Sequence, residues 1–115
     1  MNLRIIITTL PDEVIAREIA YALIRSGLVV CAWVMPSMKS IYIWENVLNE
    51  ESEYGLWVKT GASHVDHVFK MIQEMHPYEC PGIFSLIPDQ INETYARWAA
   101  TMLGHSANVS DPASS

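Results

Sequence analysis

The stretch His76-Pro77-Tyr78-Glu79-Cys80-Pro81 decides how the second half of the chain folds. Each proline fixes its own φ and disfavours helical backbone at the residue before it. A helix arriving from the N-terminal side is therefore predicted to end near Met75, and the chain to leave as an extended strand. The stretch also gathers an imidazole, a phenol, a carboxylate and a thiol in one stiff turn. Such a turn suits either a ligand site or a local structural connection.

Working outward from this turn, the hydrophobic pattern predicts alternating strands and helices. Apolar and β-branched runs predict strands over residues 3–9, 28–35, 40–48, 53–60 and 82–87. Apolar residues at helical spacing, with start and stop signals, predict helices over residues 11–26, 63–75 and 92–103. A polar turn is expected over residues 49–52. This β-α-β-β-α-β order is typical of a ferredoxin-like α/β sandwich, here with an extended aromatic hairpin and an added C-terminal helix.

Length and composition fit one domain. The chain has 115 residues, of which 50% are hydrophobic, so it can bury a core without disulfides. We expect the domain to span residues 1–104. Residues 105–115 are small and polar and are expected to form a mobile tail. No apolar run is long enough for a membrane span or a secretory signal, which predicts a cytoplasmic protein.

Charge and cysteine spacing exclude several classes of function. The formal net charge of −6 argues against a nucleic-acid binder, which needs a basic face. Cys31 and Cys80 form no CxxC pair, so they predict neither a disulfide framework nor a zinc site. No Ser-His-Asp or Cys-His-Asn order is legible, and an enzyme is not expected.

The predicted strand over residues 40–48 carries large apolar groups on both faces. Ile41 and Ile43 lie on one face, and Tyr42 and Trp44 lie on the other. The few predicted helices cannot cover both faces of the sheet. The alternatives are an aromatic ladder within a twisted hairpin or burial against a second copy of the chain, and the second is favoured.

The ordered set of short motifs resembles the CutA family of divalent-cation tolerance proteins. The likeness runs from about Ile5 to Leu103, and His76-Pro77-Tyr78-Glu79 is its most specific piece. The other matching pieces are Thr8–Glu13, Cys31, Ser40–Glu45, Val58–Thr60, Tyr95 and Trp98. The resemblance implies a homotrimer of ferredoxin-like subunits with a role in tolerance of divalent metal ions, copper above all.

The resemblance also implies a site around the HPYE turn, in a cleft between subunits. Cys31, His76 and Glu79 are its candidate ligands for a divalent metal ion. Lys59 and Tyr78 are expected beside a bound ligand. If Lys59 instead pairs with Glu79, the turn is structural. Two other functions remain open: a trimeric PII-like sensor of small anionic molecules, and a purely structural assembly module.

The chain departs from the family pattern at three positions. Trp33 follows Cys31 and Ala32 where the family often has a small or polar residue. Ser37 and Asn46 stand where glycines are usual, after the proline bend and after the Trp-Glu pair. Since asparagine tolerates left-handed backbone better than serine does, the hairpin geometry at these two positions needs a structure to define it.

Overall fold

A single antiparallel sheet with two helices on one face forms the body of the protein. The computed structural model describes residues 2–104, and the expected tail lies outside the described residues. The sheet has four strands in the order β2-β3-β1-β4. The strands are β1 (Leu3–Leu10), β2 (Val29–Trp44), β3 (Val47–Gly61) and β4 (Ile83–Leu86). The helices are α1 (Glu13–Arg25), the short 3-10 helix Ala62–His64, α2 (Val65–Met75) and α3 (Glu93–Met102). The ferredoxin-like α/β prediction is confirmed.

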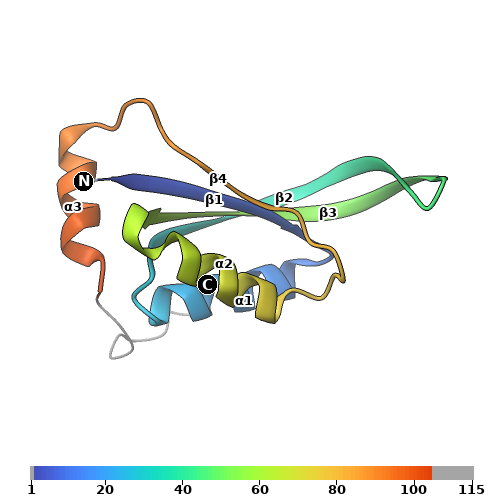
Figure 1. Ribbon diagram of the computed structural model, residues 1–115, viewed down its shortest axis with the longest axis horizontal. Helices are drawn as coiled ribbons and strands as arrows, with labels where there is room; N and C mark the ends of the chain where they lie inside the picture. The colour runs from blue at the N-terminus through green and yellow to red at the C-terminus, as the bar shows by residue number, and fades with distance from the viewer. Residues whose placement is uncertain (1, 105–115) are drawn as a thin grey trace.

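The hydrophobic core lies between the sheet and helices α1 and α2, which run side by side beneath it (Figure 1). Alternate residues of β1 and β3 point toward the helices, as expected from the two-residue period of a strand. The large, fully buried apolar side chains of this core are Ile6, Leu10, Ile19, Leu23, Leu56, Val58, Val68 and Ile72. The odd-numbered residues of β3 therefore lie on the opposite face of the sheet, which α1 and α2 leave uncovered.

Local sequence signals set the helix ends. The Asp12 carboxylate accepts a 2.9 Å hydrogen bond from the backbone N–H of Ile15, which caps the start of α1. Gly27 follows α1 with φ 79°, the left-handed conformation expected of a glycine after a helix. His76 ends α2 in extended conformation, with ψ 133°. The predicted stop near Met75, before the proline turn, is confirmed.

The predicted turn over residues 49–52 is wrong. Those residues belong to β3, where Asn49 pairs with Tyr42 and Ser52 pairs with Lys39. The chain reverses instead at Glu45 and Asn46, with φ values of 50° and 64°. Two adjacent residues with positive φ form the tight turn that matches the twist of a hairpin. The run Asn49–Ser52 is polar because this part of the strand is exposed, and polarity alone did not distinguish it from a turn.

The strand predicted over residues 28–35 and the first half of the strand predicted over residues 40–48 form one strand, β2. The end of the second prediction is wrong, because residues 45–48 hold the hairpin turn and the start of β3. The proline bend survives as an irregularity in register between Met35 and Met38. Among residues 2–104, Glu45 and Asn46 are the non-glycine residues with positive φ. Ser37 therefore needs no glycine-like backbone here, whereas Asn46 does adopt it.

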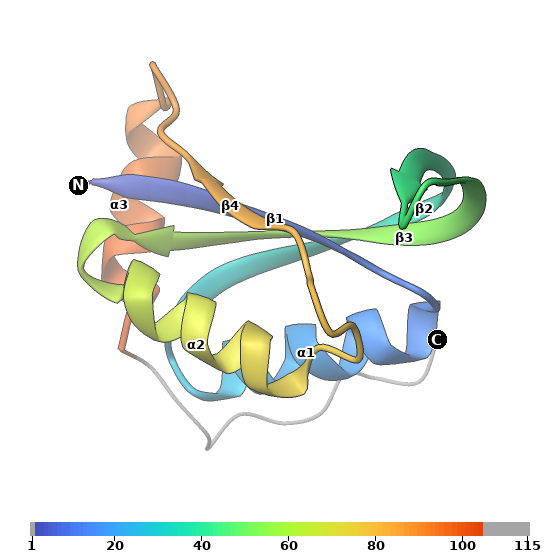
Figure 2. The same ribbon diagram turned by 45° about the vertical axis from the view of Figure 1, so that its right-hand side comes forward.

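The distal half of the β2–β3 hairpin forms an arm that projects beyond the helices (Figures 1 and 2). Its apolar side chains are largely exposed: Ile41 64%, Ile43 71%, Trp44 50%, Val47 59% and Leu48 72%. Helix α3 lies at the opposite end of the sheet (Figure 1). No helix within the described residues is long and apolar enough to cross a membrane.

Candidate functional site

The HPYE turn is attached to the hairpin stem through a buried carboxylate. Glu53 of β3 is only 6% exposed. Its Oε2 accepts a 2.6 Å hydrogen bond from the Tyr78 hydroxyl and a 3.2 Å hydrogen bond from Thr9 Oγ1. Its Oε1 accepts a further hydrogen bond from the Ser40 hydroxyl. Glu53 therefore joins β1, β2, β3 and the turn in one polar network, on the sheet face away from α1 and α2.

His76 is fixed by hydrogen bonds at both ring nitrogens. Its Nε2 lies 2.9 Å from the Thr9 carbonyl, which can only accept, so Nε2 donates. Its Nδ1 accepts a 3.2 Å hydrogen bond from the Tyr78 backbone N–H. Thr8 Oγ1 lies 3.2 Å from Nε2 as well. Burial lowers the pKa of His76, outweighing the Thr9 carbonyl and Glu53, which act in the opposite direction. The neutral imidazole thus positions the turn and leaves neither nitrogen for a metal ion.

A pocket of about 530 Å³ opens beside this network. It is lined by Thr9, Tyr42, Trp44, Glu51, Glu53, Pro77, Tyr78, Glu79, Cys80 and Gly82. We call it the acidic pocket, because three of these side chains are carboxylates. Burial raises the pKa of Tyr78, and the hydrogen bond to Glu53 raises it further, so this phenol stays neutral. Burial and the nearby Glu51 carboxylate likewise raise the pKa of Tyr42. The pocket therefore combines acidic groups, neutral phenols and the exposed thiol of Cys80.

The structure separates the predicted site residues into two groups. His76, Tyr78 and Glu79 lie at the turn, whereas Cys31 and Lys59 pair across β2 and β3 near the other end of the sheet. Along β3, the six-residue step from Glu53 to Lys59 amounts to about 20 Å at the rise of a strand. Within one chain, Lys59 therefore lies away from the HPYE turn and does not pair with Glu79. Its expected position beside the turn, in a cleft between subunits, stays a prediction.

No three His, Cys, Asp or Glu side chains among residues 2–104 lie close enough together to hold a metal ion. Of the predicted ligands, only Glu79 lines the acidic pocket with an exposed, chemically suitable group. Cys31 lies beside the ammonium of Lys59, at 3.9 Å, where a metal cation would be repelled.

Sequence reasoning missed the central member of the network, Glu53, together with Ser40 and Thr9. One signal was available. Glu53 shares a strand face with Gly55, Trp57 and Lys59, so an acid stands on a face that otherwise carries large or buried groups. A carboxylate at such a position needs hydrogen-bond partners, and nearby hydroxyl residues are the natural donors.

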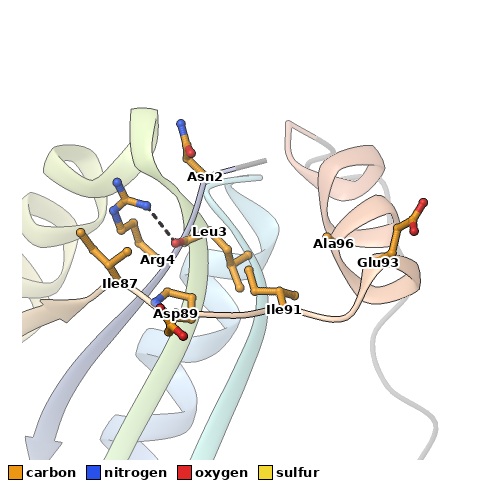
Figure 3. Close-up of a pocket in the computed structure, with 9 residues that line it drawn as sticks. Asn2, Leu3, Arg4, Ile87, Asp89, Ile91, Glu93 and Ala96 are labelled. Carbon is orange, nitrogen blue, oxygen red and sulfur yellow. Dashed lines mark hydrogen bonds between the residues drawn. The ribbon is translucent and has the colours of Figure 1, made fainter.

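A second pocket, of about 400 Å³, lies between the start of β1 and helix α3 (Figure 3). Its polar lining includes Arg4, Asp89 and Glu93. The Arg4 guanidinium donates a 3.0 Å hydrogen bond to the Leu3 carbonyl in this view (Figure 3). None of the predicted site residues lines it. The acidic pocket is therefore the better candidate for the functional site.

Comparison with known proteins agrees with this fold and its motifs. The profile of the family described as "CutA1 divalent ion tolerance protein" matches residues 4–102. The chain belongs to the CutA1 divalent ion tolerance family. The resemblance inferred from the sequence motifs is thus confirmed.

Individual CutA proteins are similar to this chain at modest sequence identity. A divalent-cation tolerance protein CutA from Thermococcus kodakarensis is 34% identical over 103 residues, covering 90% of this chain and 98% of that one. The protein CutA homolog of Xenopus laevis is 34% identical over 95 residues, covering 83% of this chain but 63% of that protein. The chain thus spans less than two thirds of that vertebrate relative. The CutA1 structure from Thermus thermophilus superimposes with a TM-score of 0.84 at 31% identity, covering 89% and 99% of the two chains.

Proposed function

We propose that this CutA1-family chain acts in divalent-cation tolerance as a homotrimer that binds divalent metal ions, copper above all, in the acidic pocket. The pocket itself carries the proposal. It places the carboxylates of Glu51, Glu53 and Glu79 around one opening, and it adds the thiol of Cys80. Carboxylates suit hard divalent ions, and a thiolate favours softer ions such as copper.

The residues present supply part of a coordination shell. Glu53 already accepts hydrogen bonds from Thr9, Ser40 and Tyr78. Its contribution to metal binding is therefore its negative charge, because its oxygen atoms are engaged. Glu51, Glu79 and Cys80 are exposed groups of the pocket that could contact an ion directly. Water or a second copy of the chain would complete the shell, which favours weak, reversible binding over permanent storage.

Self-association is supported by the exposed hairpin arm. Ile43 and Leu48 pair on one face of the arm, at more than two thirds exposure, and Trp44 and Val47 pair on the other, each at least half exposed. Together they form an apolar surface that soluble monomers rarely expose. Trp44 belongs to this arm and also lines the acidic pocket. A copy packed on the arm would therefore reach the edge of the pocket. The number three follows from the family resemblance.

A binding role in the cytoplasm agrees with the described chemistry. Cys31 and Cys80 are both free thiols, the form that a reducing compartment maintains. In the acidic pocket the buried carboxylate of Glu53 is engaged by three hydroxyls. Beside the pocket, the buried imidazole of His76 is engaged by backbone groups. These groups hold the turn in place, and we assign them no reaction.

Titration calorimetry with copper tests the metal-binding proposal. We expect Glu79→Gln and Cys80→Ser to weaken binding relative to the parent protein, because each removes a ligand atom at the pocket. Cys31→Ser is the matched control, since it removes a thiol distant from the pocket and should bind like the parent. Each variant is first checked by light scattering for the parent's oligomeric state.

Two results would overturn the proposal. Parent-like copper binding by both Glu79→Gln and Cys80→Ser would show that the acidic pocket is not the site. A parallel titration with adenine nucleotides that gives tight binding, while copper gives none, would favour the anion-sensor alternative. A monomer in light scattering at micromolar concentration would refute the homotrimer separately from the metal site.

A further inference from the structure

The second pocket, between the start of β1 and helix α3, carries charges of both signs from three separate segments (Figure 3). Arg4 belongs to β1, Asp89 follows β4, and Glu93 begins α3. We call it the β1–α3 pocket. Its volume of about 400 Å³ falls within the range of sites that hold small organic molecules. Among the described residues it shares none of its lining with the acidic pocket, so it is a separate candidate site.

Two of these three charges lack an ion-pair partner. The Glu93 carboxylate lies 3.3 Å from the Arg97 guanidinium, one turn further along α3, so its charge is compensated. Within residues 2–104, neither Arg4 nor Asp89 forms an ion pair. The Arg4 guanidinium donates one hydrogen bond, to the Leu3 carbonyl. Because a guanidinium presents several N–H donors in a planar fork, most of the donors of Arg4 remain for a ligand.

Aliphatic side chains supply the rest of the wall that a ligand would contact. Leu3, Ile87 and Ile91 contribute branched side chains, and Ala96 contributes a methyl group from α3. Leu3 is 5% exposed, whereas Ile87 is 70% exposed. A branched aliphatic group placed against Ile87 would remove apolar surface from water, which is favourable. The pocket thus combines a cation, an uncompensated anion and an aliphatic surface.

We propose that the β1–α3 pocket binds a small aliphatic α-amino acid such as leucine. Arg4 binds the α-carboxylate, Asp89 binds the α-ammonium group, and the aliphatic side chain lies against Leu3 and Ile87. The two unpaired charges select this class of ligand. A simple carboxylate would be repelled by Asp89 and a simple amine by Arg4, whereas a zwitterion pairs with both. This binding function goes beyond the metal-binding proposal and uses none of its residues.

Titration calorimetry on the full-length protein at neutral pH compares leucine with three molecules that each lack one part of it. Isocaproate lacks the ammonium group, isoamylamine lacks the carboxylate, and glycine lacks the side chain. We expect isocaproate and isoamylamine to bind at least about tenfold more weakly than leucine, because each loses a hydrogen-bonded charge pair. Glycine should also bind more weakly, since it leaves the aliphatic wall exposed. No saturable binding of leucine at millimolar concentrations, or equal binding of leucine and the two singly charged molecules, would overturn the proposal.

Two substitutions assign each charge to one end of the ligand. Arg4→Met keeps most of the length of the side chain and removes the guanidinium. We expect it to bind leucine about tenfold more weakly than the parent does, and to lose the preference for leucine over isoamylamine. Asp89→Asn should weaken leucine binding similarly and lose the preference for leucine over isocaproate. A general disturbance of the pocket would not exchange one preference for the other, so these preferences report direct contact.

Matched controls make the same substitutions at exposed positions on other elements. Arg17→Met on α1 and Asp66→Asn on α2 should bind leucine like the parent. Parent-like leucine binding by both Arg4→Met and Asp89→Asn would contradict the site, as would an equal loss in the two controls. Copper titration of the Arg4 and Asp89 variants should match the parent. The leucine site and the acidic pocket therefore fail or succeed separately.

Discussion

The Tyr78 hydroxyl donates a 2.6 Å hydrogen bond to Oε2 of Glu53, which joins the loop after α2 to the stem of the β2–β3 hairpin. Glu53 is buried, and its hydrogen-bond donors in the described part of the chain are hydroxyls rather than cations. Removing one donor leaves a buried carboxylate less well satisfied, which costs more than the loss of an exposed hydrogen bond. This hydrogen bond therefore both stabilises the fold and shapes the acidic pocket.

Tyr78→Phe removes that donor and keeps the ring. We expect the free energy of unfolding to fall by about 1.5–3 kcal/mol, the usual range for a hydrogen bond to a charged group. Urea denaturation at one fixed chain concentration measures the change, because the stability of an oligomer depends on concentration. Tyr21→Phe is the control, since Tyr21 lies exposed on α1. Equal effects of the two substitutions would show that the bond to Glu53 adds no stability.

His76 gives stability a defined dependence on pH. Because burial lowers its pKa below the ordinary 6.5, the unfolded chain binds the proton more strongly than the folded chain does. The contribution of neutral His76 is complete above about pH 6.5 and is lost as the pH falls toward the lowered folded-state pKa. We expect urea midpoints to decrease between pH 7.5 and pH 5.

Replacing the imidazole tests this assignment. His76→Gln retains an N–H that can reach the Thr9 carbonyl but cannot titrate. We expect it to be less stable than the parent at pH 7.5 and to lose less stability on acidification. His67→Gln is the control, because it makes the same substitution at an exposed position on α2. A parent-like slope in His76→Gln would assign the acid sensitivity to other groups.

The sequence predicted those elements whose limits depend on neighbouring residues. Asp12, Gly27 and the proline after His76 act through backbone groups within a few positions, so the limits of α1 and the end of α2 were predictable. The hairpin turn was not, because Asn49–Ser52 has the composition of a turn and the pairing of a strand. The polar composition of this segment reflects its exposure to solvent. Whether it pairs as a strand depends on residues of β2, which no local pattern includes.

The site was predictable only in part, for a similar reason. The HPYE motif identified the turn, yet the role of His76 depends on Thr8 and Thr9, which lie far away in the sequence. A histidine in a motif suggests a ligand until both ring nitrogens are shown to be occupied. The distance of Lys59 from the turn follows from strand direction and register, which no local pattern encodes.

Asn46 supports the hairpin turn through its left-handed backbone. Its φ of 64° costs about 1–2 kcal/mol for a residue with an ordinary Cβ, less for asparagine, and little for glycine. We expect Asn46→Ala to lower the free energy of unfolding by about 1 kcal/mol, and Asn46→Gly to preserve or raise it. Urea denaturation of the two variants measures the difference. A more stable alanine variant would show that the turn adopts another conformation in solution.

Trp44 links assembly to the acidic pocket. Its ring is 50% exposed in the single chain, lies on the hairpin arm and lines the acidic pocket. If a second copy covers the arm, Trp44→Ala removes a large side chain from the interface and should cost about 3–5 kcal/mol of association free energy. We expect light scattering during dilution to show dissociation of this variant at concentrations where the parent remains assembled.

The control is Val14→Ala, which changes an exposed apolar residue on α1 and should leave the oligomer intact. Because the same ring borders the pocket, the dissociated variant should also bind copper more weakly. Loss of assembly with unchanged copper binding would place the metal site entirely within one chain, whereas an intact oligomer would show that the arm is not the interface.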